Sequence, residues 1–213
     1  MRILVGREQR GLDRSALVER LSAYRRLVID VGTGGGRAVL AAAAAEPDAL
    51  VVGLDADAAS MADASRRAAA SSARGGRPNA LFVIGAAEDL PGPFEDLADE
   101  VVIRFPWGSL LRGALTGAGP VAAGLAGAVR AGGSLVLLTA LQPKDGYDDL
   151  LPLVDDPALL AAQLRATYGP LALRLEECRI ATLEEIASAR SSWARRLRVG
   201  RDRNAVVARL RRS

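Results

Sequence analysis

Apolar positions along the chain follow two alternating periods, and their order predicts the fold. Short, almost wholly apolar runs typical of buried strands occur at residues 26–31, 49–54, 80–84, 100–105 and 134–139. Helical spacing lies between them, at residues 34–45, 57–73 and 119–130. Because strands that alternate with crossover helices form parallel sheets, the pattern predicts a doubly wound α/β fold.

The C-terminal part of the pattern predicts a different closing unit. Two strands, at residues 171–180 and 203–210, flank a helix at 183–198. A closing pair of this kind favours an antiparallel C-terminal edge strand. Added to the five central strands, it gives a mostly parallel, seven-stranded sheet.

Two further segments lie outside this regular pattern within one predicted domain, residues 1–213. Residues 1–25 form an N-terminal extension, in which Asp13 is placed to cap a helix over 14–24. Residues 141–157 are acidic and contain prolines, and we interpret them as an inserted loop.

Composition then excludes several kinds of chemistry. The 213 residues include no histidine and one cysteine, Cys178, which excludes histidine bases, disulfide frameworks and metal sites built on these residues. We expect no metal. No apolar stretch reaches the roughly 20 residues of a membrane span, so no membrane contact is expected. The sequence MRILVGREQR lacks the apolar core of a signal peptide, which favours a cytoplasmic location.

Charge is distributed unevenly along the chain. The net charge is only +3, but residues 190–213 hold nine arginines against a single acid, Asp202. This basic C-terminal segment therefore carries +8, and the other residues sum to −5. Clustered arginines of this kind are the electrostatic signature of phosphate binding.

The loop after the first predicted strand has the character of a cofactor site. It reads Asp30-Val31-Gly32-Thr33-Gly34-Gly35-Gly36-Arg37, and its glycines allow tight turns and close approach to a ligand. The helix that follows favours an anionic group at its N-terminus. Arg37 occupies a position where a dinucleotide site requires glycine, and no lysine follows in a phosphate-loop arrangement.

Two later strand ends supply polar groups to the same predicted site. Asp55 ends the second strand, 23 residues after Gly32, where a carboxylate accepts hydrogen bonds from ribose hydroxyls. The turn Ala87-Glu88 follows the third strand, near the expected position of an adenine ring. This arrangement resembles the S-adenosylmethionine (SAM) site of Rossmann-like methyltransferases, with SAM as the implied cofactor.

Both tryptophans lie in segments that suit recognition of a nucleic-acid base. Trp107 follows the fourth strand in the loop FPWGSLLRG, which also contains Ser109 and should face the transferable methyl group. Trp193 lies within the arginine run SWARRLRVGRDR. Arginines neutralise phosphates and an aromatic face stacks a base, so the two segments together favour RNA as the substrate.

Several motifs together resemble one enzyme family over residues 5–208. GREQRGLD, VIDVGTGGGR, VVGLDAD, PNALFVIGAAEDLP, FPWGSLLRG and SWARRLRVGRDR are similar to the aminoglycoside-resistance 16S rRNA (adenine(1408)-N(1))-methyltransferases of the kanamycin–apramycin type. The resemblance implies a class I SAM-dependent fold. It also implies methylation of N1 of the decoding-site adenine in the assembled 30S subunit, and hence aminoglycoside resistance.

The resemblance also implies roles for individual residues. Trp107 and Trp193 would hold the flipped adenine, with Ser191 beside the second tryptophan. The predicted RNA contacts are Arg196, Arg201 and Arg203. The predicted cofactor contacts are Asp30, Gly32, Gly34, Asp55, Ala87, Glu88 and Ser109. The chain departs from its relatives at Gly35, where they carry an acidic residue, and in the 141–157 insert.

Three other functions remain compatible with these residues. The enzyme could methylate another RNA, because stacking and phosphate contacts carry little sequence information. It could methylate a small molecule, although such an enzyme has no use for an arginine-rich edge. A noncatalytic RNA-binding relative is the third, and cofactor binding distinguishes it from the enzymes. We expect the chain to act as a monomer with the 30S subunit as its partner.

Overall fold

The computed structural model describes residues 1–189 and 204–213. Within these residues a single sheet contains nine strands, which confirms the predicted α/β class but exceeds the seven strands expected. The strands are β1 (Arg2–Val5), β2 (Glu8–Gly11), β3 (Arg26–Val31), β4 (Ala49–Asp55), β5 (Ala80–Ile84), β6 (Ala98–Arg104), β7 (Val129–Thr139), β8 (Leu173–Ile180) and β9 (Val206–Arg212).

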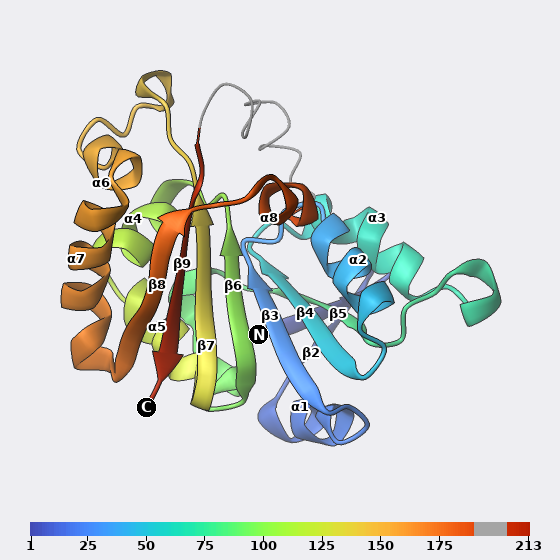
Figure 1. Cartoon of the computed structure of the whole chain (residues 1–213). Coiled ribbons are helices and arrows are strands. Elements are labelled where there is room, and N and C mark those ends of the chain that lie inside the picture. Colours follow the sequence, from blue (N-terminus) through green and yellow to red (C-terminus); the bar gives the residue numbers. More distant parts are fainter. Residues whose placement is uncertain (190–203) are drawn as a thin grey trace.

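The strand order is β2-β1-β5-β4-β3-β6-β7-β9-β8 (Figure 1). The five central strands β3 to β7 are mutually parallel, as the alternating pattern predicts. Strand β9 is antiparallel to both β7 and β8, so the C-terminal antiparallel strand exists. It lies between its two neighbours rather than at the edge, and β8 is the edge strand. The predicted placement at the edge is therefore wrong by one position.

The two additional strands form a hairpin within the N-terminal extension. Strand β1 pairs antiparallel with β5, and β2 covers β1. Residues 8–11 are all exposed, so β2 lacks the alternation of buried and exposed positions that identifies a strand in a sequence. This is why the hairpin is missing from the sequence prediction. Asp13 caps the next helix as predicted, since its carboxylate accepts a hydrogen bond from the Ala16 N–H at 2.8 Å.

Helices cover the sheet on both faces, as a doubly wound fold requires (Figure 1). Apolar residues of α2 and α3 pack on one face, and those of α1, α4, α5 and α7 form the larger core on the other. The helices are α1 (Arg14–Leu21), α2 (Arg37–Ala45), α3 (Ala58–Ala68), α4 (Gly108–Thr116), α5 (Val121–Ala128), α6 (Leu151–Asp155), α7 (Pro157–Tyr168) and α8 (Leu183–Ser188).

Residues 141–157, which we expected to form an inserted loop, contain regular structure. A 3₁₀ turn spans Pro143–Asp145, and α6 follows at Leu151–Asp155. Leu150 and Val154 anchor this segment in the main core. Prolines favour the loop interpretation, yet a proline is well tolerated in the first turn of a helix, where its missing N–H has no helical partner. The same reasoning applies to α7, which begins at Pro157.

Among the described residues, no helix combines the length and the apolar character that crossing a membrane requires.

Candidate active site

A cavity of about 340 Å³ opens at the carboxyl ends of the parallel strands. Loops after β3, β4, β5 and β6 all contribute to its wall, because parallel strands end on the same edge of the sheet. Six predicted site residues line it: Gly32, Asp55, Ala87, Glu88, Trp107 and Ser109. The structure therefore brings together residues from four separate segments of the sequence.

The glycine loop after β3 forms one wall of the cavity. Gly32 has φ of +72°, and a Cβ atom added there would lie 2.6 Å from the Leu110 Cδ2 atom. Any side chain at this position would therefore strain the backbone and push the Leu110 side chain aside. The loop ends at Gly36, the left-handed N-cap of α2, where an added Cβ atom would overlap the Phe82 ring and lie 2.7 Å from the Ala64 Cβ atom. Close packing, as well as the turn itself, thus requires glycine here.

Asp55 stands at the end of β4 and fixes the same loop. Its Oδ2 atom accepts a hydrogen bond from the Gly34 N–H at 2.7 Å, and its Oδ1 atom accepts one from the Asp57 N–H at 2.9 Å. Gly34 does not itself line the cavity, so its role is to hold this contact. A carboxylate has about four acceptor sites, so Asp55 retains capacity for two hydroxyl donors from a ligand.

Asp30 does not line the cavity, although we predicted that it contacts the cofactor. The residue is 3% exposed, and its carboxylate accepts hydrogen bonds from the Thr33 hydroxyl and the Arg104 guanidinium, each at 2.8 Å. Arg104 ends the neighbouring strand β6. This cluster joins the ends of β3 and β6, and its hydrogen bond from the Thr33 hydroxyl also holds the glycine loop. Sequence analysis did not identify Arg104, because only the strand register places it beside Asp30.

The loop after β6 carries Trp107 over the cavity. Phe105 adopts a left-handed conformation with φ of +51°, which is uncommon for a residue with a side chain. Its N–H still donates to the Leu138 carbonyl at 2.7 Å, so the chain turns immediately after its last sheet contact. Trp107 follows Pro106 and is 42% exposed. A large aromatic face thus remains accessible at the mouth of the cavity.

Trp107 also contacts the 141–157 segment. The rings of Trp107 and Tyr147 meet edge to face, with centroids 4.8 Å apart and an interplanar angle of 90°. Sequence analysis missed Tyr147, because no periodicity or motif relates it to a loop 40 residues earlier in the chain.

Five predicted site residues, Ser191, Trp193, Arg196, Arg201 and Arg203, lie outside the described residues. The structure describes the chain again from Asn204, and it describes the residues up to Ala189. Ala189 and Ala205 are both buried, in a cluster that also contains Phe105 and Leu138. The chain therefore leaves and re-enters the described structure near the carboxyl ends of β6 and β7, where the Trp107 loop begins.

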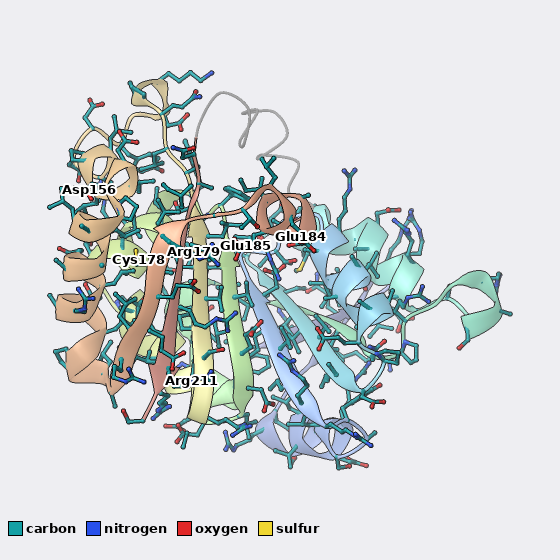
Figure 2. All side chains as sticks on the ribbon, viewed as in Figure 1. Asp156, Cys178, Arg179, Glu184, Glu185 and Arg211 are labelled. Carbon is teal, nitrogen blue, oxygen red and sulfur yellow. The ribbon has the colours of Figure 1, made fainter. Side chains whose placement is uncertain are left out.

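Three of the nine arginines in the basic C-terminal segment belong to the opposite end of the sheet. Arg209 pairs with Glu100 at 3.3 Å, Arg211 with Glu176 at 3.5 Å, and Arg212 with Asp96 at 2.5 Å. Figure 2 shows Arg211 at the end of the sheet remote from α8. These arginines stabilise β9 and do not contribute to a surface beside the cavity. Only the six arginines within residues 190–203 remain for such a role.

Helix α8, which precedes those six arginines, is fixed to β8 by an ion-pair cluster. Both guanidinium NH groups of Arg179 donate to the Glu185 carboxylate at 2.9 Å, and Glu185 also forms a capping box with Thr182 (Figure 2). The hydrogen bonds from Arg179 lower the pKa of Glu185 from 4.5 to about 2. Arg179 also contacts Glu177, and these contacts together raise the pKa of its guanidinium.

We expect Glu185→Gln to remove a pH-dependent part of the stability. A carboxylate with a lowered folded-state pKa stabilises the protein above its unfolded pKa, near 4.5, and this stabilisation is lost as the pH falls towards 2. The difference in free energy of unfolding between wild type and variant should therefore shrink over that range. Urea denaturation across the range measures it, with the exposed neighbour Glu184→Gln as control. Parallel pH profiles for wild type and Glu185→Gln would contradict the assignment.

Comparison with known proteins identifies the family of this site. The family described as NpmA: 16S rRNA (adenine(1408)-N(1))-methyltransferase matches residues 2–211. The chain belongs to this family. A 16S rRNA (adenine(1408)-N(1))-methyltransferase from Streptoalloteichus hindustanus is 35% identical over 213 residues, covering 98% of this chain and 97% of that protein. One from Escherichia coli is 29% identical and covers 96% and 95%.

Solved structures agree with this membership. The 16S rRNA methyltransferase KamB superposes with a TM-score of 0.87 at 34% identity, covering all of both chains. A tryptophan-to-alanine variant of the Catenulisporales acidiphilia enzyme, solved with its cosubstrate SAM, gives a TM-score of 0.85 at 28% identity, covering 100% of this chain and 96% of that one. The methyltransferase fold that the sequence motifs imply is thereby confirmed.

Proposed function

We propose that this protein transfers the methyl group of SAM to N1 of adenine 1408 in the 16S rRNA of the 30S subunit, and that the modification gives aminoglycoside resistance. The observation that carries the proposal is the cavity in which Gly32, Asp55 and Glu88 meet Trp107. It combines a nucleoside-binding wall with an exposed aromatic face, within a chain of this family. Because ribosomal subunits are the substrate, we place the reaction in the cytoplasm.

The residues present suit SAM. The cavity falls within the range of roughly 300–1,000 Å³ that is usual for small-molecule sites. Asp55 has the remaining acceptor capacity for the two ribose hydroxyls, and Gly32 brings bare backbone to the cavity wall. Ala87 and Glu88 line the cavity after β5 and would face the adenine, and Ser109 lines it two residues after Trp107.

The chemistry assigned to the chain is mainly positioning. The sulfonium of SAM supplies an activated methyl group, and neutral adenine N1 supplies the lone pair that accepts it. A strong base is therefore unnecessary, in keeping with a chain that has no histidine. Holding the two reactants in near-attack geometry lowers the barrier by about 7–11 kcal/mol. Trp107 and Trp193 would hold the base that has left its stack, with Ser191 beside it.

Unstacking the target adenine costs a few kcal/mol, which the protein must offset. Stacking on one aromatic side chain contributes about 1–3 kcal/mol per base. Two tryptophan faces therefore offset the cost where one falls short. Ala189 and Ala205, on either side of residues 190–203, are buried in one cluster with Phe105, and this supports assigning Trp193 to the same site as Trp107.

Primer extension across adenine 1408 tests the function directly. Purified 30S subunits are incubated with enzyme and SAM, and a methyl group at N1 blocks base pairing and stops the polymerase at that nucleotide. A stop that depends on both enzyme and SAM is the expected result. If the stop is absent while calorimetry shows SAM binding, the enzyme methylates another substrate. If SAM does not bind, the protein is a noncatalytic relative.

The basic segment makes a separate prediction about salt dependence. Each phosphate that an arginine neutralises contributes about 0.7–0.9 to the slope of log binding constant against log salt concentration. Replacing Arg201 and Arg203 together by alanine should flatten the slope for 30S binding by about two such contributions. Arg209→Ala and Arg211→Ala, which remove arginines paired at the far end of the sheet, are the matched controls. An unchanged slope for the first pair would show that these arginines do not contact phosphate.

A further inference from the structure

The 141–157 segment is built against the loop that carries Trp107. Tyr147 makes the edge-to-face contact with the indole ring, and its hydroxyl accepts a hydrogen bond from the Gly108 N–H at 2.8 Å. Arg112, one turn further along α4, forms an ion pair with Asp149. Three contacts from one short segment therefore reach the indole ring, the first backbone N–H of α4 and the surface of that helix.

The Tyr147 hydroxyl gives the Gly108 N–H an acceptor that the neighbouring residues in the sequence do not supply. The first N–H groups of a helix have no partner within the helix, and a polar N-cap side chain normally accepts one of them. The N-cap of α4 is Trp107, which makes no such side-chain hydrogen bond. The Tyr147 hydroxyl accepts from the first of these N–H groups, that of Gly108, from outside the helix. It thereby fixes the backbone on the C-terminal side of the indole.

Tyr147 is itself held firmly enough to act as a support. Its carbonyl accepts hydrogen bonds from the N–H groups of Leu150 and Leu151, each at 2.9 Å. Leu150 is 2% exposed and belongs to the main core, and the Tyr147 ring packs against the same core. On its other side, the 3₁₀ turn is closed by the Asp145 carboxylate, which accepts from the Gln142 N–H at 2.8 Å. The ring therefore connects Trp107 to the rigid part of the molecule.

We infer that Tyr147 is a positioning residue, which sets the orientation of Trp107 and of the first turn of α4 for stacking the target base. This inference rests on the proposed function and assigns the 141–157 segment a part in it. Tyr147 acts through Trp107 and Gly108, and does not line the cavity itself. An edge-to-face pair engages at most one face of the indole, so the contact restricts the ring and does not cover the opposite face.

Fluorescence tests the contact without any substrate. The chain has two tryptophans, so Trp193→Phe leaves Trp107 as the single emitter. In this background Tyr147→Ala should raise acrylamide quenching and lower the anisotropy of Trp107, whereas Tyr147→Phe, which keeps the ring, should stay close to the parent. Tyr24→Phe is the matched control, because Tyr24 packs against the core just before β3, away from this loop. Unchanged quenching in Tyr147→Ala would overturn the inference.

Kinetics on 30S subunits tests the consequence. Loss of a neutral hydrogen bond in Tyr147→Phe should lower kcat about 2- to 13-fold, and Tyr147→Ala, which also loses the ring contact, should lower it further. The dissociation constant of SAM should stay near wild type in both. A wild type that methylates 30S subunits with variants equal to it would overturn the inference alone. A wild type without activity on 30S subunits would overturn the proposed function, and circular dichroism confirms that each variant is folded.

Discussion

Trp107→Ala is expected to lower kcat/KM for methylation of 30S subunits about 5- to 150-fold, while SAM binding stays close to wild type. The estimate is the loss of one stacking face, about 1–3 kcal/mol, converted to a rate ratio. The side chain is 42% exposed at the mouth of the cavity, so its removal leaves no void in the core. Single-turnover methyl transfer to 30S subunits, with calorimetry of SAM binding alongside, measures the two effects separately.

Three further variants sharpen this experiment. Trp107→Phe keeps an aromatic face and should lose less activity than Trp107→Ala. Leu159→Ala removes another large apolar side chain, 49% exposed on α7, and serves as the control for loss of exposed apolar surface. Trp193→Ala should resemble Trp107→Ala if both rings hold the same base. Wild-type rates for either tryptophan variant would contradict the two-sided stacking of the adenine.

The central fold is predictable because its strands are buried on both faces. Residues 27–31 of β3 are all buried, and such a run, apolar except for Asp30, has few structural alternatives. The N-terminal hairpin differs. Strand β2 is wholly exposed, so no buried positions mark it in the sequence, and only its pairing with β1 makes it a strand. The order of β9 and β8 likewise depends on pairing over long sequence distances. Periodicity describes the environment of a segment, and it does not specify its neighbours.

The site residues divide in the same way, into those that the sequence pattern places and those that depend on how strands pair. Gly32, Asp55, Ala87 and Glu88 are predictable, because they follow strands whose ends must meet at one edge. Asp30 lies outside the cavity wall, and its carboxylate accepts from Thr33 and Arg104; its contact with the cofactor stays a prediction. Whether a carboxylate faces a ligand or a neighbouring guanidinium depends on the register between strands. Arg104 ends β6 and Asp30 lies one residue before the end of β3, so their contact depends on how these two strands pair, which the pattern of apolar positions does not specify.

Asp55→Ala is expected to weaken SAM binding at least about 100-fold. The ribose hydroxyls would lose two hydrogen bonds to a charged acceptor, each worth about 1.5–3 kcal/mol. The variant also removes the acceptor of the Gly34 N–H, so the glycine loop loses its tie to β4. Both effects act on the cofactor, so the loss should appear in the dissociation constant of SAM measured by calorimetry, before any RNA is added.

Asp55→Asn separates the two effects. The amide oxygen can still accept from the Gly34 N–H, so the loop should remain in place while the charge is lost. We therefore expect an intermediate SAM affinity and a melting temperature near that of wild type. Asp63→Asn, an exposed aspartate of α3 that pairs with Arg66, controls for loss of a negative charge on the same side of the sheet. If Asp55→Ala bound SAM as tightly as Asp63→Asn, the nucleoside would have to lie elsewhere in the cavity, and the assignment of its ribose to the end of β4 would be wrong.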